Sequence, residues 1–338
     1  MTGYFRVCAL IIFSLIAFEM SESTVSAAET IGGVVSGFLF DAHSHTIRPL
    51  HGIPGAATLG DSLQLNISIS TAAISSRSDY ALAVDRDHNN LIQIQRLRDL
   101  RSVRVLQAGT RKIERIVLSP EGTAALLYRQ YPNTVQLISG LQGSPQILPE
   151  WSLDALNAEP VTLAVSDDGQ YALAAAGSSV FLLETGGSAR PMFHGNRISD
   201  VTFLNQKDDA LVADAGDNKV FFISKASSVA AAVVLRDQSS GIAAPVAVRA
   251  SRDGLRVFVL NSKPAGVVAF EPKTGIAKVF PCAASLTGLD TLNGNALFRL
   301  NELTHGPLWV FNGDAYNAGV FFVPALHPIA PTKWSGPK

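Results

Sequence analysis

Three features of the 338-residue sequence predict its fold class. Short segments rich in β-branched and aliphatic residues alternate with turn residues along most of the chain, as strands do. No long stretch has the apolar spacing of a helix together with capping residues at both ends. A turn of the type Ser-x-Asp/Glu-Gly recurs every 40 to 47 residues, the length of a four-stranded repeat. We therefore expect an all-β fold, a β-propeller of four-stranded antiparallel blades.

The recurring turn divides the chain into blades. Its clearest copies are 119–122, 166–169 and 251–254, and weaker copies occur at 78–79, 207–209 and 292–294. Six full repeats follow residue 61. Ahead of them, 37–50 is predicted as one hairpin that lies beside the last blade or forms part of a seventh, because a closed ring needs its chain ends to meet. Seven blades fit the chain length best, and six are the alternative.

Each repeat is predicted to hold four strands in a fixed order around the turn, since apolar segments of strand length flank every copy. First strands, before the turn, are 113–118, 161–165, 201–204 and 246–250. Second strands, after the turn, are 80–84, 124–128, 171–175, 210–213, 257–260 and 296–300. Third strands are 91–94, 135–138, 180–183, 220–223, 267–270 and 308–311. Fourth strands at 103–106, 233–235, 277–280 and 320–323 complete most units.

The clearest repeat is 251–275, which begins Ser-Arg-Asp-Gly-Leu-Arg-Val-Phe-Val-Leu-Asn-Ser. It resembles the repeat of YVTN-type β-propellers, relatives of WD40-like and lactonase-like propellers, with Phe258 to Asn261 in the place of the signature tetrapeptide. Residues 166–187 are a looser copy. The resemblance runs from residue 37 to residue 323 and implies the fold, whereas propellers of this kind carry many different activities.

The first 27 residues are predicted to be a signal peptide. Arg6 precedes the apolar run 7–18, which has the length of a secretory h-region and is too short to span a membrane. Small residues before position 28 place the cleavage after Ala27, with cleavage after Ala28 as the near alternative. An uncleaved anchor is the other alternative. We expect a secreted or periplasmic bacterial protein with one propeller domain in 28–325 and an extended C-terminal tail in 326–338.

Composition narrows the range of partners. The 27 Lys and Arg residues balance 28 Asp and Glu residues and are scattered, so we expect no nucleic acid partner and, after cleavage, no membrane span. Cys282 is then the only cysteine, and we expect it to be a buried small hydrophobic residue. No cofactor is expected, because the chain has no Walker loop, no Gly-x-Gly-x-x-Gly and no Gly-x-Ser-x-Gly.

Two kinds of segment have features of metal sites. His43 and His45 form a His-x-His pair after a strand, as in amidohydrolase-type barrels, but the helices of such a barrel are missing, so a polar hairpin turn is the favoured interpretation. Residues 85–90 begin like a calcium loop and lack its glycine and its closing glutamate. We interpret this segment and 214–218 as β-turns between second and third strands.

Polar residues at the ends of second strands form the candidate ligand site. In a propeller, the turns between second and third strands share one face with the blade-to-blade loops, around the mouth of the central channel. On that face we expect Asp85, Arg129, Asp214, Asn261 and Asn301 to hold a polar ligand or a partner loop. The alternative is that they are ordinary polar strand ends.

Two classes of function remain. The first is an exported, non-catalytic binding or scaffold module for a protein, a glycan or a small polar ligand. The second is a lactonase-like or other hydrolase with its active site at the mouth of the central channel. The family resemblance alone implies this second class, and no motif assigns it a catalytic residue.

Overall fold

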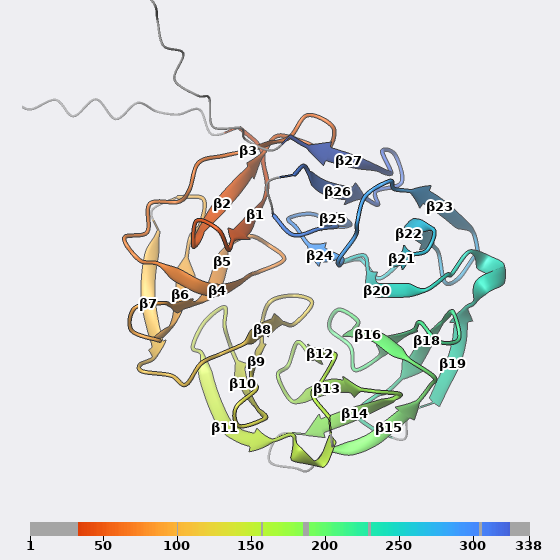
Figure 1. Cartoon of the computed structure of the whole chain (residues 1–338), viewed down its shortest axis with the longest axis horizontal. Helices are drawn as coiled ribbons and strands as arrows, with labels where there is room; N and C mark the ends of the chain where they lie inside the picture. The colour runs from red at the N-terminus through yellow and green to blue at the C-terminus, as the bar shows by residue number, and fades with distance from the viewer. Residues whose placement is uncertain are drawn as a thin grey trace, which may run out of the picture. The chain divides into compact units, whose positions relative to one another are not determined.

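Seven antiparallel β-sheets, arranged in a ring, make up the described part of the chain (Figure 1). The computed structural model describes residues 33–99, 101–156, 158–184, 189–228, 231–303 and 306–324. Helical structure in these segments is limited to two short 3-10 turns, Asp154–Leu156 and Gln238–Ser240. No helix among them has the length and apolar character needed to cross a membrane. The predicted all-β fold with seven blades is thus confirmed.

Two predicted segments fall outside the described residues, namely the signal peptide 1–27 and the C-terminal tail 326–338.

Six of the sheets have four strands each, with the first strand innermost in the ring and the fourth outermost. The first three of these sheets are β4 (Ile69–Ile74), β5 (Tyr80–Asp85), β6 (Leu91–Gln95) and β7 (Ser102–Gln107); β8 (Arg115–Leu118), β9 (Ala125–Arg129), β10 (Thr134–Ser139) and β11 (Gln146–Ser152); and β12 (Thr162–Val165), β13 (Tyr171–Ala176), β14 (Ser179–Glu184) and β15 (Arg190–His194).

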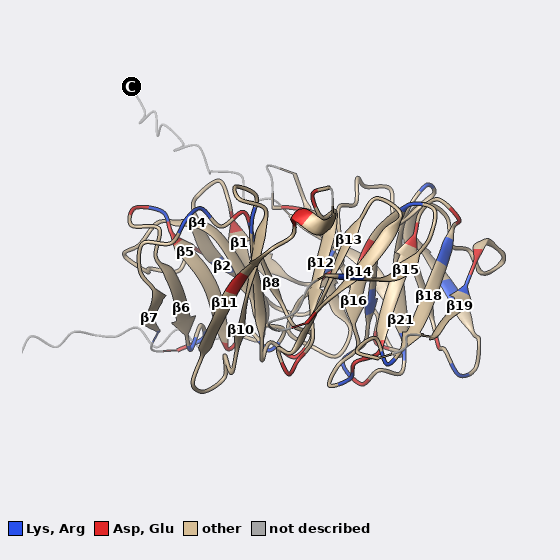
Figure 2. Ribbon diagram, turned by 90° about the horizontal axis from the view of Figure 1, so that it is seen from below, with Lys and Arg blue, Asp and Glu red and all other residues tan. Residues whose placement is uncertain are grey.

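The other three four-stranded sheets follow in chain order. They are β16 (Ile198–Phe203), β17 (Ala210–Asp214), β18 (Lys219–Ser224) and β19 (Ala231–Arg236); β20 (Pro245–Ala250), β21 (Val257–Ser262), β22 (Ala265–Phe270) and β23 (Ala277–Pro281); and β24 (Asp290–Thr291), β25 (Leu297–Arg299), β26 (Leu308–Asn312) and β27 (Gly319–Val323). The side view in Figure 2 shows these strands crossing the thickness of the ring.

Two outermost strands were not identified from the sequence. β11 contains Pro149 and β15 contains Pro191, and proline breaks the apolar pattern of a strand. Proline is tolerated there because an outermost strand has a partner on one side only. The predicted first strand 113–118 is also shorter than expected and begins at Arg115.

The recurring turn between first and second strands has a local physical cause. The Ser166 hydroxyl accepts a hydrogen bond from the Tyr171 N–H at 3.1 Å, and the Ser251 hydroxyl accepts one from the Arg256 N–H at 3.0 Å. Three residues after each serine the backbone is left-handed, with φ of 69° at both Gly169 and Gly254. A serine followed three residues later by a glycine therefore marks this turn in the sequence.

Apolar side chains between neighbouring sheets hold the ring together. One such cluster joins Leu126 and Val135 of one sheet to Leu163 and Ala174 of the next, all of them buried. Second strands are rich in alanine, which allows adjacent sheets to approach closely.

The N-terminal sheet has only three strands, β1 (Val35–Asp41), β2 (Thr46–His51) and β3 (Thr58–Leu59). The predicted hairpin 37–50 is therefore part of a seventh blade. Phe38 and Ile47 pack on one neighbouring sheet, which contains β5 and β6, and Leu39 and Leu50 pack on the last sheet, which contains β25 and β26. Side-chain packing on both faces of this sheet closes the ring.

Candidate functional site

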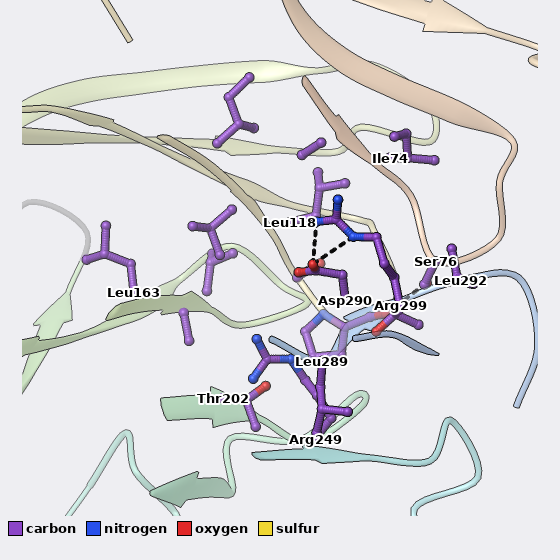
Figure 3. Close-up of a pocket in the computed structure, with 18 of the residues that line it drawn as sticks. Ile74, Ser76, Leu118, Leu163, Thr202, Arg249, Leu289, Asp290, Leu292 and Arg299 are labelled. Atoms are coloured by element: carbon purple, nitrogen blue, oxygen red, sulfur yellow. Dashed lines mark hydrogen bonds and ion pairs between the residues drawn. The ribbon is translucent and has the colours of Figure 1, made fainter. Parts of the chain in front are cut away.

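A cavity of about 570 Å³ lies at the centre of the ring. All seven sheets contribute to its wall, through β1, β4, β8, β12, β16, β20 and β24 and, in the last sheet, also through Arg299 of β25. Figure 3 shows some of the lining side chains. The volume of this cavity falls within the range of sites for small molecules.

The cavity wall combines apolar and polar surface. Ile74, Leu118 and Leu163 supply aliphatic side chains from three consecutive sheets, β4, β8 and β12 in order. Thr202 on β16 and Arg249 on β20 supply polar groups on another side (Figure 3). Other sheets contribute polar side chains as well, among them Ser76, Asp290 and Arg299, so a ligand in the cavity would meet hydrogen-bonding groups on several sides.

One nitrogen of the Arg249 guanidinium, Nη1, is hydrogen-bonded within the protein, and the opposite edge of the group is free. Nη1 donates to Asp200 Oδ2 at 2.5 Å and to the Val248 carbonyl at 2.6 Å. Within the described residues neither Nε nor Nη2 has a hydrogen-bond partner, although the side chain is only 28% exposed. Nε and Nη2 lie on the same edge of a guanidinium, and that edge matches the two oxygens of a carboxylate.

Asp200 fixes the position of this guanidinium. Its Oδ1 accepts a hydrogen bond from Thr162 Oγ1 at 2.9 Å, and its Oδ2 accepts one from the Val248 N–H at 2.9 Å in addition to that from Arg249. Its side chain is only 7% exposed. Asp200 thus links β12, β16 and β20, and the linked strands hold Arg249 at the cavity wall.

Arg299, a second guanidinium at the cavity wall, is fully engaged within the protein. Its Nε and Nη2 donate to Asp290 Oδ2 at 3.1 and 2.5 Å (Figure 3). Its Nη1 donates to Glu302 Oε2 at 2.9 Å. Burial alone would lower the pKa of Arg299, but the two carboxylates outweigh it and raise that pKa. Arg299 therefore has no free donor edge comparable with that of Arg249.

Side chains from the turns between first and second strands reach across one end of the channel. Glu121, in the turn after β8, accepts hydrogen bonds from Arg77 Nη2 at 2.5 Å and from Asn205 Nδ2 at 2.7 Å. Arg252 Nη2 donates to the Ser76 carbonyl at 2.7 Å, and its Nε lies 3.8 Å from Glu121 Oε1. Because these turns belong to sheets on different sides of the ring, the contacts span this end of the cavity.

The five residues expected at the channel mouth lie at or just beyond second-strand ends, and none of them lines the cavity. Asp214 is fully buried, and its carboxylate accepts hydrogen bonds from the N–H groups of Asn196, Arg197 and Gly216. Burial alone would raise the pKa of Asp214, but these backbone donors outweigh it and hold the pKa below its usual value. Asp85 in the same way accepts from the Asp87 N–H at 2.9 Å.

Two of the other three residues are also engaged within their own surroundings. Asn261 Oδ1 accepts from the Ala243 N–H at 3.1 Å, and Asn301 Oδ1 accepts from the Trp309 N–H at 2.7 Å. Arg129 is 2% exposed and is engaged only in part. Its Nη2 donates to Gln136 Oε1 at 3.2 Å and its Nη1 lies 3.7 Å from Glu150 Oε2, but Nε and Nη1 have no hydrogen-bond partner among the described residues.

No hydrogen bond or ion pair among the described residues joins any two of the five. The structure places them at or near the ends of the second strands of five different sheets.

The segments that resemble metal sites are turns. Asp41, Asp85 and Asp214 each end a strand, and the residue four positions after each of them, His45, Asn89 or Asn218, has a left-handed backbone with φ of 52° to 55°. The Asp41 carboxylate accepts from the N–H groups of His43 and Ser44, as the other two aspartates accept from their own turns. Within the described segments, no three His, Cys, Asp or Glu side chains are grouped so that they could bind a metal ion.

Cys282 is buried, as expected, and has no disulfide partner among the described residues. Burial raises the pKa of its thiol.

The residues that define the cavity were not singled out from the sequence. Arg252 occupies the variable position of the recurring turn and Glu121 its acidic position, and they were noted only as parts of that repeat. A charged residue at the variable position is the one sequence signal that could have drawn attention to Arg252. Nothing local distinguishes Arg249, whose role depends on Asp200 in the preceding sheet.

The fold and the site define a seven-bladed β-propeller with a partly polar central cavity. A family model described as "Lipoprotein LpqB beta-propeller domain" matches residues 141–274, which is less than half of the chain. No curated protein matches the chain in sequence.

Two solved structures are similar to this ring. A functionally unknown protein from Desulfotomaculum acetoxidans DSM 771 is 17% identical, with a TM-score of 0.57 over 87% of this chain and 100% of that chain. The RRP9 WD40 repeats are 10% identical, with a TM-score of 0.50 over 79% of this chain and 83% of that chain. At these identities the similarity shows the fold alone.

Proposed function

We propose that this protein is a non-catalytic binding module whose ligand site is the central cavity. The ligand is a small polar molecule that carries a carboxylate and hydroxyl groups. One observation carries the proposal, namely the Nε–Nη2 edge of Arg249, which lines the cavity without a hydrogen-bond partner among the described residues.

The physical argument rests on the geometry of this free edge. The Arg249 side chain is partly exposed, and its Nε and Nη2 are not among the buried atoms that lack a partner, so a ligand would replace water on them. A carboxylate placed on the free edge would restore two charge-assisted hydrogen bonds without moving Nη1 from Asp200. Thr202 also lines the cavity, and its hydroxyl oxygen can accept from a hydroxyl group of the same ligand while it donates to the Phe203 carbonyl.

Export to the bacterial envelope is part of the proposal. The predicted signal peptide 1–27 supports it, and so does the family match, because the matching family is described as a lipoprotein domain. We also propose that the repeats are of the YVTN type, on the strength of residues 251–275. We also propose that a protein or a glycan could bind the polar residues at the ends of the second strands.

The test is calorimetric titration of the mature protein with gluconate, a hydroxylated carboxylate, and with glucose, its neutral counterpart. We expect gluconate to bind and glucose to bind at least tenfold more weakly, because only gluconate offers two anionic oxygens. Arg249→Gln should abolish the preference for gluconate. Arg104→Gln, on the exposed outermost strand β7, is the matched control and should leave it unchanged. Equal binding of gluconate to the Arg249→Gln variant would refute the proposed site.

The same preparation tests the hydrolase alternative. Glucono-δ-lactone opens to gluconate on hydrolysis, so an enzyme of the lactonase type would accelerate the release of acid above the rate in buffer. The binding proposal predicts no acceleration. Turnover that is lost when a cavity residue is substituted would refute the binding proposal and support the hydrolase alternative.

A further inference from the structure

A dense group of basic residues lies in the turn between β6 and β7. Arg96, Arg98 and Arg101 fall within six residues of one another, and Asp99 is the only acid among them. All three arginines are exposed, and none of them forms an ion pair with another described residue. Because the chain as a whole has a formal net charge of -1, this turn is a local excess of positive charge.

The backbone of this turn is held in place by its own contacts. Leu97 is fully buried, and its N–H donates to the Asp79 carbonyl at 3.4 Å. The Asp99 N–H donates to the Arg96 carbonyl at 3.1 Å, and Arg101 Nε donates to the Leu97 carbonyl at 3.3 Å. A partner that binds this turn would therefore restrict side chains only, which lowers the entropic cost of binding.

Two exposed apolar residues lie beside this turn. Val34 is 65% exposed and Ile53 is 57% exposed. The Gly52 N–H donates to the Val34 carbonyl at 2.7 Å, which brings the two apolar residues together. Val35 and Leu97 pack in one cluster between the N-terminal sheet and the sheet of β4 to β7, so the apolar pair and the arginines flank the same cluster.

The apolar pair and the arginines lie on the same face of the ring. The N–H of Asn293, in the turn between the first and second strands of the last sheet, donates to the Ser36 carbonyl at 3.0 Å. The start of β1 therefore lies on the face of these turns. Asp79 belongs to the corresponding turn between β4 and β5, so its bond with Leu97 places the arginines on that face as well.

The acidic side chains in the turns between first and second strands are already bonded. The Asp79 carboxylate accepts from the Ser75 hydroxyl, and Glu121 accepts from two side chains of other turns. Asp167 accepts from two backbone N–H groups. The remaining acids of these turns also accept hydrogen bonds, namely Asp168, Asp208, Asp209 and Asp253. None of these bonds involves an arginine of the turn after β6.

We propose that Arg96, Arg98, Arg101, Val34 and Ile53 form a surface, which we call the basic rim, that binds an anionic lipid membrane. The guanidinium groups would bind lipid phosphates, and the two apolar side chains would enter the interface. A soluble polyanion would leave Val34 and Ile53 in water, so a lipid surface fits both parts of the rim. The inference is independent of the proposed ligand, because none of the five residues lines the central cavity.

The test is sedimentation of the mature protein with lipid vesicles. Vesicles of phosphatidylglycerol and phosphatidylcholine in equal parts are the anionic probe, and vesicles of phosphatidylcholine alone are the neutral probe. At about 0.1 M salt we expect at least roughly tenfold stronger binding to the anionic vesicles, because each basic residue near such a surface contributes about fivefold. At about 1 M salt, where the Debye length is about 3 Å, the difference should disappear. Equal binding to the two kinds of vesicle at low salt would overturn the proposal.

Three double variants locate the binding surface. Arg98→Gln with Arg101→Gln should weaken binding to anionic vesicles by roughly tenfold or more. Arg86→Gln with Arg197→Gln removes the same charge from exposed arginines on the opposite face, and this matched control should lose far less. Arg98→Lys with Arg101→Lys keeps the charge and should keep the binding. Equal losses in the two glutamine variants would show that overall charge, and not the basic rim, attracts the protein to the vesicles.

Val34→Ser with Ile53→Ser tests the apolar part of the basic rim. This variant should bind anionic vesicles about threefold more weakly or worse, because less apolar surface leaves water. Both side chains are exposed, so circular dichroism should show an unchanged fold. Polyphosphate in solution is the competing probe. Unchanged vesicle binding in this variant, or polyphosphate binding as tight as vesicle binding, would indicate a soluble polyanion and contradict the proposal.

Discussion

The carboxylate of Asp200 and the guanidinium of Arg249 form an ion pair that joins two neighbouring sheets at the wall of the central cavity. The same carboxylate binds Thr162 of the preceding sheet. Three consecutive innermost strands thus share one buried acid, and the arginine that it orients keeps one donor edge free. The polar part of the cavity is therefore a product of the ring and not of any single blade.

Asp200→Asn should destabilise the protein by about 2 kcal/mol, because it removes the charge that compensates Arg249 and turns an amide N–H₂ toward donors. Chemical denaturation followed by circular dichroism measures this change. Asp99→Asn, in an exposed loop, is the control and should alter stability by less than about 0.5 kcal/mol. An equal loss of stability in the two variants would show that the link of Asp200 to β12 and β20 contributes nothing to the stability of the protein.

Asp214 should make stability depend on acid pH. Its pKa in the folded protein lies below the ordinary value, because backbone donors outweigh the effect of burial. A lowered folded pKa means that its contribution is present above about pH 4 and is lost as the pH falls further through the folded pKa. Asp214→Asn should cost about 1 to 3 kcal/mol at pH 7 and flatten the acid limb of the stability profile. If the variant loses stability at acid pH in the same way as the unmodified protein, the acid sensitivity comes from other carboxylates.

Glu121 and Asn205 should be energetically coupled although they are 84 residues apart and their sheets are not neighbours. A double-mutant cycle of Glu121→Ala and Asn205→Ala should give a coupling of about 0.5 to 3 kcal/mol. Additive effects of the two substitutions would mean that the side chains do not meet across the channel.

Gly254→Ala tests the backbone cause of the repeat. No atom lies within 4 Å of an added Cβ, so the left-handed φ of 69° is the only source of cost, and we expect a loss of about 1 kcal/mol. Gly143→Ala also meets no neighbour and has no positive φ, so it should cost less or even stabilise. A Gly254→Ala variant as stable as the Gly143→Ala variant would contradict this explanation.

The ring was predictable from the sequence because its repeating turn has a local origin. The turn needs a serine whose hydroxyl accepts from a backbone N–H and a glycine in the left-handed region, and these two residue types lie three positions apart in the sequence. The outermost strands β11 and β15 were missed because their prolines, harmless at an edge, break the apolar pattern.

The candidate site was not predictable in this way. Asp85, Asp214 and Asn261 were expected at the channel mouth because they end second strands, yet their oxygens are used by backbone N–H groups of nearby loops. The bond between Arg252 and Ser76 spans 176 residues and exists only because the ring closes. A single sequence holds no local trace of such a contact.

A crystal structure of the mature protein grown with gluconate tests the central claim most directly, because it shows where the carboxylate lies. The account predicts that both carboxylate oxygens lie within hydrogen-bond distance of Nε and Nη2 of Arg249, with Nη1 still on Asp200. An ordered Arg249 whose free edge faces empty cavity, with gluconate bound elsewhere on the ring, would contradict it.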